Sequence, residues 1–97
     1  MPSRPSVELD RHRAAVLSLL HSTGASDVRV FGSVARGEDN PGSDLDLLAT
    51  LPESMGLFEL VALEQALEDI LGVPVDIVDA RSRSRVITEA LADAVPL

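Results

Sequence analysis

The chain has 97 residues, enough for one small domain with a single core, and we expect that domain to span residues 1–97 without a separate substrate-binding unit. Sixteen acidic residues against eight basic ones give a formal net charge of −8, which disfavours binding to long nucleic acids because that affinity comes largely from cationic contacts with phosphate. The absence of cysteine excludes disulfides, and without a membrane-length apolar run or a signal-peptide stretch we expect a soluble, cytoplasmic protein.

The first predicted element is a helix. Residues 1–5 are expected to be disordered, and a helix should run from Ser6 or Val7 to about Ser22 and stop near Gly24. Its apolar face is formed by Leu9, Val16, Leu17 and Leu20. A stripe of this kind is typical of a helix that packs on one side against a core.

Two short strands follow. The β-branched run Val28–Phe31 predicts the first strand and leads directly into Gly32-Ser33, after which residues 33–37 should form a helical turn. A loop dense in turn-forming residues comes next, and the apolar run Asp44–Thr50 predicts the second strand. The loop between the strands favours an antiparallel pairing.

The second half of the chain predicts a helix, a strand and a helix. A strongly amphipathic helix is expected over Leu57–Leu71, a third strand over Val75–Val78, and a final helix from about Val86 to Ala94. A strand–helix–strand unit of this length forms a right-handed crossover, so the second and third strands should be parallel neighbours. The predicted fold is therefore α/β (α+β), a three-stranded mixed sheet with helices packed on one face, in the order α-β-(short α)-β-α-β-α.

Two aspartates mark the second strand as the candidate site. Asp44 and Asp46 stand at positions i and i+2, so their side chains project from the same face while Leu45 and Leu47 enter the core. Two carboxylates about 5 Å apart repel each other by about 3 kcal/mol at an effective dielectric of about 20, which a strand would not keep for stability alone. Because hard carboxylate oxygens suit Mg²⁺, we interpret the pair as a metal site, joined by Asp76 from the third strand.

The turn after the first strand supplies the other half of the site. Gly32 lets the backbone approach a phosphate closely, and Ser33 can open a helix whose free N–H groups and hydroxyl bind an anion. Arg36 lies one turn further on, where its guanidinium can contact a phosphate, the alternative being a surface ion pair with Glu38 or Asp39. Metal ligands beside a phosphate-binding turn indicate a nucleotide site; the other interpretation is a Gly-Ser turn before two solvated aspartates.

These residues together resemble the nucleotidyltransferase (DNA polymerase beta-like) superfamily. The residues that match are Gly32-Ser33, a ten-residue spacer containing Ala35-Arg36-Gly37, Asp44-x-Asp46, and Asp76 in a later strand. They are most similar to the minimal nucleotidyltransferases (MNT), which serve as antitoxins to HEPN-domain toxins. The resemblance implies that the three aspartates are catalytic residues and ligands of two Mg²⁺ ions, and that Gly32, Ser33 and Arg36 bind the phosphates of ATP.

The same resemblance implies a partner and a reaction. AMP would pass from ATP to a HEPN ribonuclease toxin, on a tyrosine hydroxyl near its active site, and neutralise it within a hetero-oligomer. A chain of this size has no room for an acceptor domain, so the acceptor should arrive on a partner protein. One alternative is a non-catalytic antitoxin that inhibits the toxin by complex formation and keeps a vestigial nucleotide site. Another is transfer of a nucleotide to a small molecule.

Overall fold

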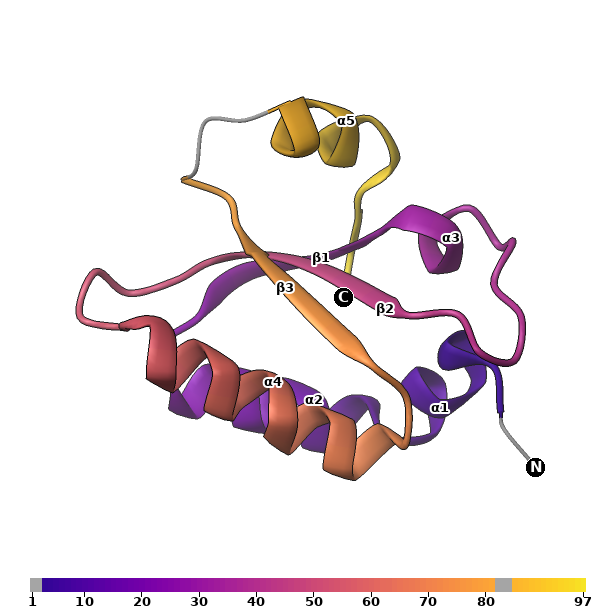
Figure 1. The fold of residues 1–97 in the computed structure, drawn as a ribbon, viewed down its shortest axis with the longest axis horizontal. Helices are drawn as coiled ribbons and strands as arrows, with labels where there is room; N and C mark the ends of the chain where they lie inside the picture. The colour runs from indigo at the N-terminus through magenta and orange to yellow at the C-terminus, as the bar shows by residue number, and fades with distance from the viewer. Residues whose placement is uncertain (1–2, 82–84) are drawn as a thin grey trace.

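The computed structural model describes residues 3–81 and 85–97, and within these ranges the chain forms five helices and four strands (Figure 1). In chain order they are α1 (Pro5–Arg11), α2 (Arg13–Ser22), β1 (Ser26–Phe31), α3 (Gly32–Ala35), β2 (Leu45–Thr50), α4 (Leu57–Leu71), β3 (Val75–Asp79), α5 (Arg85–Asp93) and β4 (Val95–Pro96). The predicted α/β fold and the order of its elements are confirmed, and the bounds predicted for α4 match. None of the described helices is long and apolar enough to cross a membrane.

The sheet has four strands in the order β3-β2-β1-β4, one more than predicted. The predicted pairings are both confirmed, because β1 runs antiparallel to β2 and β2 runs parallel to β3. The additional strand, β4, pairs antiparallel with β1, with Val95 opposite Val30. Sequence patterns could not reveal it, since two residues that include a proline carry no period-2 alternation.

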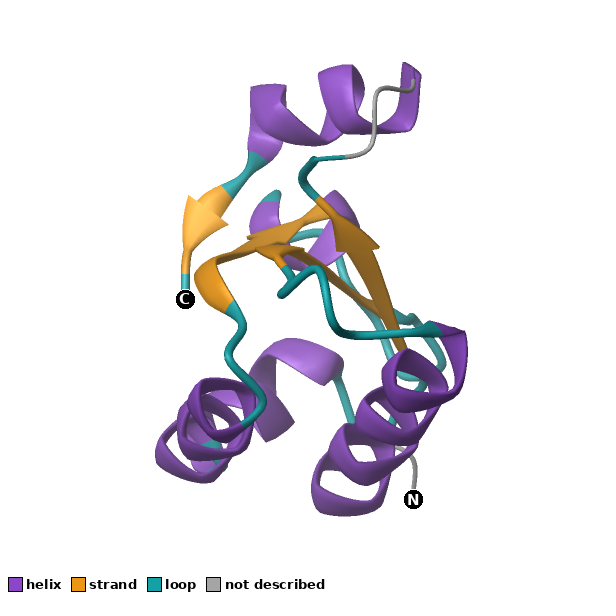
Figure 2. Ribbon diagram, turned by 90° about the vertical axis from the view of Figure 1, so that its left-hand side faces the viewer, coloured by secondary structure: helices purple, strands orange, loops and turns teal. Residues whose placement is uncertain are grey.

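One face of the sheet is covered by α1, α2 and α4, and the main core lies between them and the strands (Figures 1 and 2). The strand residues that enter this core are those expected from alternation: Leu45, Leu47, Val75 and Ile77. From the helices, Val16, Leu20 and Leu67 are fully buried. The amphipathic patterns of the sequence therefore fix which side of the sheet becomes the core.

Helix α5 lies on the opposite face, whereas all the helices were predicted on one face (Figure 2). The reason is a second, smaller apolar cluster, in which Ile87 and Ala90 of α5 pack on Leu48, with Phe31 and Val78 at its border. Leu48 follows a core residue in β2, so its side chain emerges on the other face and requires a cover.

The N-terminal helix differs from the prediction in being split at His12. This residue has φ −121° and ψ 19°, outside the helical region, and separates α1 from α2. Helix α1 begins at Pro5, within the segment 1–5 that was predicted to be disordered, and residues 1 and 2 lie outside the described residues. Proline suits this first position because it needs no N–H partner there.

Candidate active site

Asp46 lies at the centre of the candidate site because the sheet flanks it with two of the other predicted site segments. It stands opposite Asp76 across the parallel β2–β3 pair and opposite Phe31 across the antiparallel β1–β2 pair. Gly32 and Ser33 follow directly after Phe31. Strand pairing alone therefore brings the glycine-serine turn and Asp76 to either side of one carboxylate.

The charges of both other predicted aspartates act on Asp46. Burial, and then the charges of Asp76 and Asp44, raise the pKa of Asp46, while the nearby Arg36 opposes this effect. Asp46 is half-buried, whereas Asp44 and Asp76 are exposed. The fold thus holds repelling carboxylates on one face without neutralising them, as a site for a cation requires.

Gly32 lies beside the Asp46 carboxylate, and a side chain at its position would be strained. Its φ is +74°, and a Cβ at this position would lie 2.5 Å from Asp46 Oδ2. A side chain at position 32 is therefore unfavourable for two reasons: the backbone conformation, and the closeness of the Asp46 oxygen. The turn at the end of β1 is packed directly against the acidic cluster.

Ser33 is the second residue of α3 and is half-buried. The helical turn predicted over residues 33–37 begins one residue earlier, at Gly32, and ends at Ala35. The N-cap residue of α3, Phe31, makes no side-chain capping hydrogen bond, so it leaves the backbone N–H groups of the first turn to another acceptor. Together with the serine hydroxyl they form a donor set suited to phosphate oxygens.

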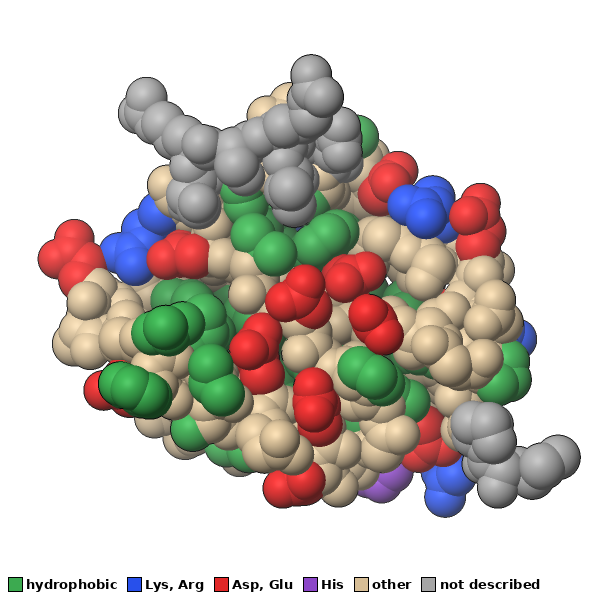
Figure 3. Space-filling model, viewed as in Figure 1, with side chains coloured by type: hydrophobic (Ala, Val, Ile, Leu, Met, Phe, Trp, Pro, Cys, Tyr) green, Lys and Arg blue, Asp and Glu red, His purple; other side chains and the backbone are tan. Residues whose placement is uncertain are grey.

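The chemistry of the carboxylates can be compared with the needs of a metal ion. Within residues 3–81 and 85–97, no group of three or more His, Cys, Asp or Glu side chains forms a ready-made metal site. Figure 3 shows acidic side chains gathered across the middle of one face, with basic side chains only toward its margins. Exposed and half-buried carboxylate oxygens fit Mg²⁺, which takes few protein ligands and completes its shell with water and substrate phosphates. The donors fit an ion that binds together with a nucleotide.

Arg36 adopts the ion-paired alternative. Its Nε donates to Glu38 Oε2 and its Nη1 to Asp93 Oδ2, both at 3.1 Å. The hydrogen bonds to Glu38 and Asp93 raise the pKa of Arg36. The guanidinium thereby joins α3 to the end of α5, close enough to affect Asp46, and its contact with a phosphate stays a prediction.

Sequence reasoning missed the role of Asp39, a charged residue whose side chain is completely buried. Its Oδ2 accepts from the Ser6 N–H at 2.9 Å, and its Oδ1 accepts from Arg4 Nη2 at 3.3 Å. Burial alone would raise the pKa of Asp39, but the hydrogen bonds from Ser6 and the Arg4 guanidinium hold it below its ordinary value. Asp39 thus caps α1 and ties down the loop that leads to Asp44.

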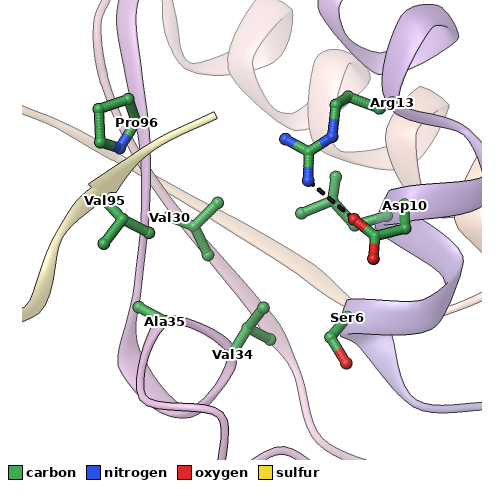
Figure 4. A pocket seen from close by; sticks show the side chains of 9 residues that line it. Ser6, Asp10, Arg13, Val30, Val34, Ala35, Val95 and Pro96 are labelled. Atoms are coloured by element: carbon green, nitrogen blue, oxygen red, sulfur yellow. Dashed lines mark hydrogen bonds and ion pairs between the residues drawn. The ribbon is translucent and has the colours of Figure 1, made fainter.

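A cavity of about 190 Å³ lies beside α3, but away from the aspartates (Figure 4). Val30, Val34 and Ala35 line one side, and the Asp10–Arg13 ion pair, 2.9 Å long, lines the other. None of the three site aspartates lines it. It is a gap between α1, α3 and β4 and not part of the candidate site.

Comparison of the sequence with known proteins points to one family. A family model described as a nucleotidyltransferase domain matches residues 9–94. The protein adenylyltransferase MJ0435 of Methanocaldococcus jannaschii is 30% identical over 90 residues, which cover 88% of this chain and 97% of that protein. The protein adenylyltransferase MntA of Thermococcus cleftensis is 42% identical over 55 residues, covering 57% of this chain and 56% of MntA.

Comparison of the fold with solved structures points the same way. A structure described as a minimal nucleotidyltransferase has a TM-score of 0.81 and 48% identity, with 95% of each chain covered. A toxin–antitoxin structure with AMP-PNP has a TM-score of 0.76 and 24% identity, covering 86% of this chain and 69% of that one. The MNT antitoxin in complex with a tri-AMPylated HEPN toxin of Shewanella oneidensis has a TM-score of 0.70 and 21% identity, covering 90% and 69%.

Proposed function

The chain belongs to the nucleotidyltransferase domain family, and we propose that it is a Mg²⁺-dependent protein adenylyltransferase that acts as the antitoxin of a HEPN toxin. The observation that carries the proposal is the position of Asp46 between Asp76 and the Gly32 turn. The names of the relatives support the choice of acceptor, since MntA is a protein adenylyltransferase and a structural neighbour binds an AMPylated HEPN toxin. The aligned segment spans about half of MntA.

The proposed reaction is an in-line displacement at the α-phosphate of ATP. A hydroxyl oxygen of the toxin, which we assign to a tyrosine, forms a bond to the α-phosphorus. The bond from that phosphorus to the bridging oxygen breaks, pyrophosphate leaves with the electron pair, and the hydroxyl proton passes to water. The toxin gains one AMP group for each ATP consumed.

The residues of the site divide this work between them. Asp44 and Asp46 would hold one Mg²⁺ and, with Asp76, a second. Bound there, the two ions would neutralise the triphosphate and lower the pKa of the acceptor hydroxyl. The N–H groups and hydroxyl of the Gly32-Ser33 turn would bind the β- and γ-phosphates, and a pyrophosphate product would leave from the same donors.

The test is nucleotide transfer to a HEPN-domain toxin, for which the product of the gene adjacent to that of this chain is the first protein to try. Purified chain, partner, ATP and Mg²⁺ are incubated, and the intact mass of the partner is followed for added adenylyl groups. Asp46→Asn should reduce the rate by at least about 100-fold, because loss of the outer partners of metal ligands alone costs about 10–100-fold. Asp69→Asn, on the exposed surface of α4, is the matched control and should leave the rate unchanged.

The same preparation distinguishes the non-catalytic alternative. If Asp44→Ala with Asp46→Ala still neutralises the toxin and binds it equally well, inhibition comes from complex formation and the enzymatic proposal is wrong. Thermal unfolding of the chain alone, with and without ATP and Mg²⁺, reports nucleotide binding independently of the partner.

A further inference from the structure

Asp76 lies in an edge strand, β3, whereas Asp46 lies in β2, which has a neighbouring strand on each side. Strand β3 is held by β2 on one side only. Leu45 N–H donates to Pro74 O at 2.9 Å and Ala80 N–H donates to Ala49 O at 2.8 Å, so alternate residues of β3 face β2. By this alternation Asp76 turns its backbone groups toward β2, and the residues on either side of it turn theirs to the outer edge.

Two glutamates of α4 occupy that outer edge. Val75 N–H donates to Glu68 Oε2 at 3.0 Å, and Ile77 N–H donates to Glu64 Oε2 at 2.8 Å. The two N–H groups belong to the residues immediately before and after Asp76. The carboxylates therefore bracket the predicted metal ligand from the side that the sheet leaves open.

The geometry of the crossover makes this bracket possible. Glu64 and Glu68 are one helical turn apart on the same face of α4, and the N–H groups of Val75 and Ile77 are two strand residues apart, both spacings being about 6–7 Å. Helix α4 leads into β3 through a short turn and runs back along it, so the later glutamate meets the earlier strand residue. The equal spacing of the two carboxylates and the two N–H groups therefore sets the position of β3 along α4.

Glutamates at positions 64 and 68 add negative charge that no basic side chain of α4 offsets. Neither Glu64 nor Glu68 takes part in an ion pair within the described part of the chain, and α4 contains no lysine or arginine. Both are half-buried and add negative charge beside β3, the strand that carries Asp76. An edge strand can be protected more cheaply by a lysine or a bulge. An ionised carboxylate, however, is a strong acceptor for a backbone N–H group, which a lysine is not.

We propose that Glu64 and Glu68 are positioning residues for the metal site, which hold β3 on both sides of Asp76 and so set its carboxylate against Asp46. The inference rests on the proposed function, since it assumes that Asp76 is a metal ligand. It assigns the two glutamates no contact with metal or nucleotide. Their effect passes through the backbone of β3.

The test separates the acceptor from its charge. Glu64→Ala and Glu68→Ala remove the acceptor, whereas Glu64→Gln and Glu68→Gln remove the charge but keep a carbonyl oxygen for the same N–H. Glu59→Ala, an exposed glutamate on the same helix, is the control. Binding of Mn²⁺ with ATP is measured by calorimetry without the partner, and hydrogen exchange follows the amides of Val75 and Ile77.

The alanine variants should weaken Mn²⁺ binding about 10-fold or more, as other outer partners of metal ligands do. They should also raise the Mg²⁺ concentration needed for half-maximal transfer. Hydrogen exchange should be faster at Ile77 in Glu64→Ala and at Val75 in Glu68→Ala. The glutamine variants should recover most of the metal affinity, and the control should match the wild type. Should an alanine variant fail to fold, Glu64→Asp and Glu68→Asp replace it, because they keep the charge but draw the acceptor back from the N–H by one methylene; they should weaken Mn²⁺ binding, and affinity equal to the wild type would overturn the inference.

Two results would overturn the inference. If exchange at Val75 and Ile77 accelerates while Mn²⁺ binding stays unchanged, the glutamates only protect the sheet edge. If Asp76→Asn leaves Mn²⁺ binding intact while Asp46→Asn abolishes it, Asp76 is not a ligand and has no need of positioning. The second result would also remove Asp76 from the proposed set of metal ligands, whereas transfer of AMP to the toxin is tested separately through Asp46.

Discussion

The two faces of the sheet use the same strand for opposite purposes. Along β2, Leu45, Leu47 and Ala49 are completely buried against α2 and α4, while Asp46, between two of them, faces the other side beside Asp44 and Asp76. The first face removes apolar surface from water, and the second gathers charges that repel. A small domain can hold such a site because the stabilising residues and the site residues alternate along a single strand.

The faces also differ in how they are held. The helical face depends on a continuous apolar cluster. Among the described residues, the site face has the small cluster around Leu48 together with polar contacts. Those contacts are Asp39 to the start of α1 and Arg36 to Glu38 and Asp93. The difference predicts that substitutions on the helical face change stability most, and that substitutions on the site face change stability less but alter binding.

The largest expected effect is that of Leu47→Ala. The side chain is completely buried in the main core, so its truncation should lower the free energy of unfolding by about 2–5 kcal/mol. Leu48→Ala, on the other face and equally buried, should cost less because its cluster is small and can close over the gap. Denaturant unfolding of both variants measures the difference, and an equal or larger loss for Leu48 would break the comparison.

Asp39→Asn should have the next largest effect, a loss of about 1–3 kcal/mol at neutral pH. The reason is that a buried carboxylate loses charge-assisted hydrogen bonds to Ser6 and Arg4. Asp10→Asn, at an exposed ion pair with Arg13, should cost less than about 0.5 kcal/mol and serves as the control.

The pH dependence of this difference has a definite sign. Because the folded state lowers the pKa of Asp39, its stabilisation is complete above the ordinary carboxyl pKa of about 3.9 and is lost as the pH falls through the lower folded value. The gap between wild type and Asp39→Asn should therefore narrow in acid. A gap that stays constant from neutral pH to pH 2 would show that the charge of Asp39 is not the source of the effect.

Much of the site could be predicted because it depends on local patterns. The crossover rule makes β3 the neighbour of β2, which brings Asp76 opposite Asp46. The predicted strand began at Asp44, whereas β2 begins at Leu45, so Asp44 lies just before the strand and its i, i+2 relation to Asp46 stays a prediction. These inferences need only strand alternation and connection length. The fold class followed from the same two rules.

The residues that escaped prediction act across long stretches of chain. Asp39 caps a helix whose recipient N–H lies 33 residues earlier, and capping patterns are recognisable only when they are local. Glu64 and Glu68 read as the polar face of an amphipathic helix until β3 is placed beside them. The prediction that α5 packs on the same face as the other helices was wrong. Alternation puts Leu48 on the opposite face, but the sequence does not show which element covers it.

A smaller effect is expected for Gly32→Ala, and it should act on both stability and binding. The positive φ of Gly32 should cost alanine about 1–2 kcal/mol, and its Cβ would also displace the Asp46 carboxylate. Gly37→Ala is a matched control, with φ +71° and no atom within 4 Å of the added Cβ. Both variants should lose stability, but only Gly32→Ala should lose Mn²⁺ and ATP binding in calorimetry. If Gly32→Ala and Gly37→Ala bind Mn²⁺ and ATP equally well, Gly32 is not part of the binding site.

The smallest expected effect is a gain in stability. Asp46→Asn removes a charge that burial and the neighbouring Asp76 and Asp44 make unfavourable, so the chain without ligands should gain about 0.2–1 kcal/mol at neutral pH. Because the folded state raises the pKa of Asp46, the gain should be complete above that raised value and vanish below the unfolded value of about 3.9.

Ligands should reverse the sign of this difference. With ATP and Mg²⁺ present, binding to the folded state stabilises the wild type, whereas Asp46→Asn binds weakly and gains little. Thermal unfolding of both proteins with and without the ligands therefore gives four melting temperatures whose order is fixed in advance. If Asp46→Asn is less stable than the wild type without ligands, Asp46 stabilises the fold. The site face would then contribute to stability at Asp46, contrary to the difference between the two faces described above.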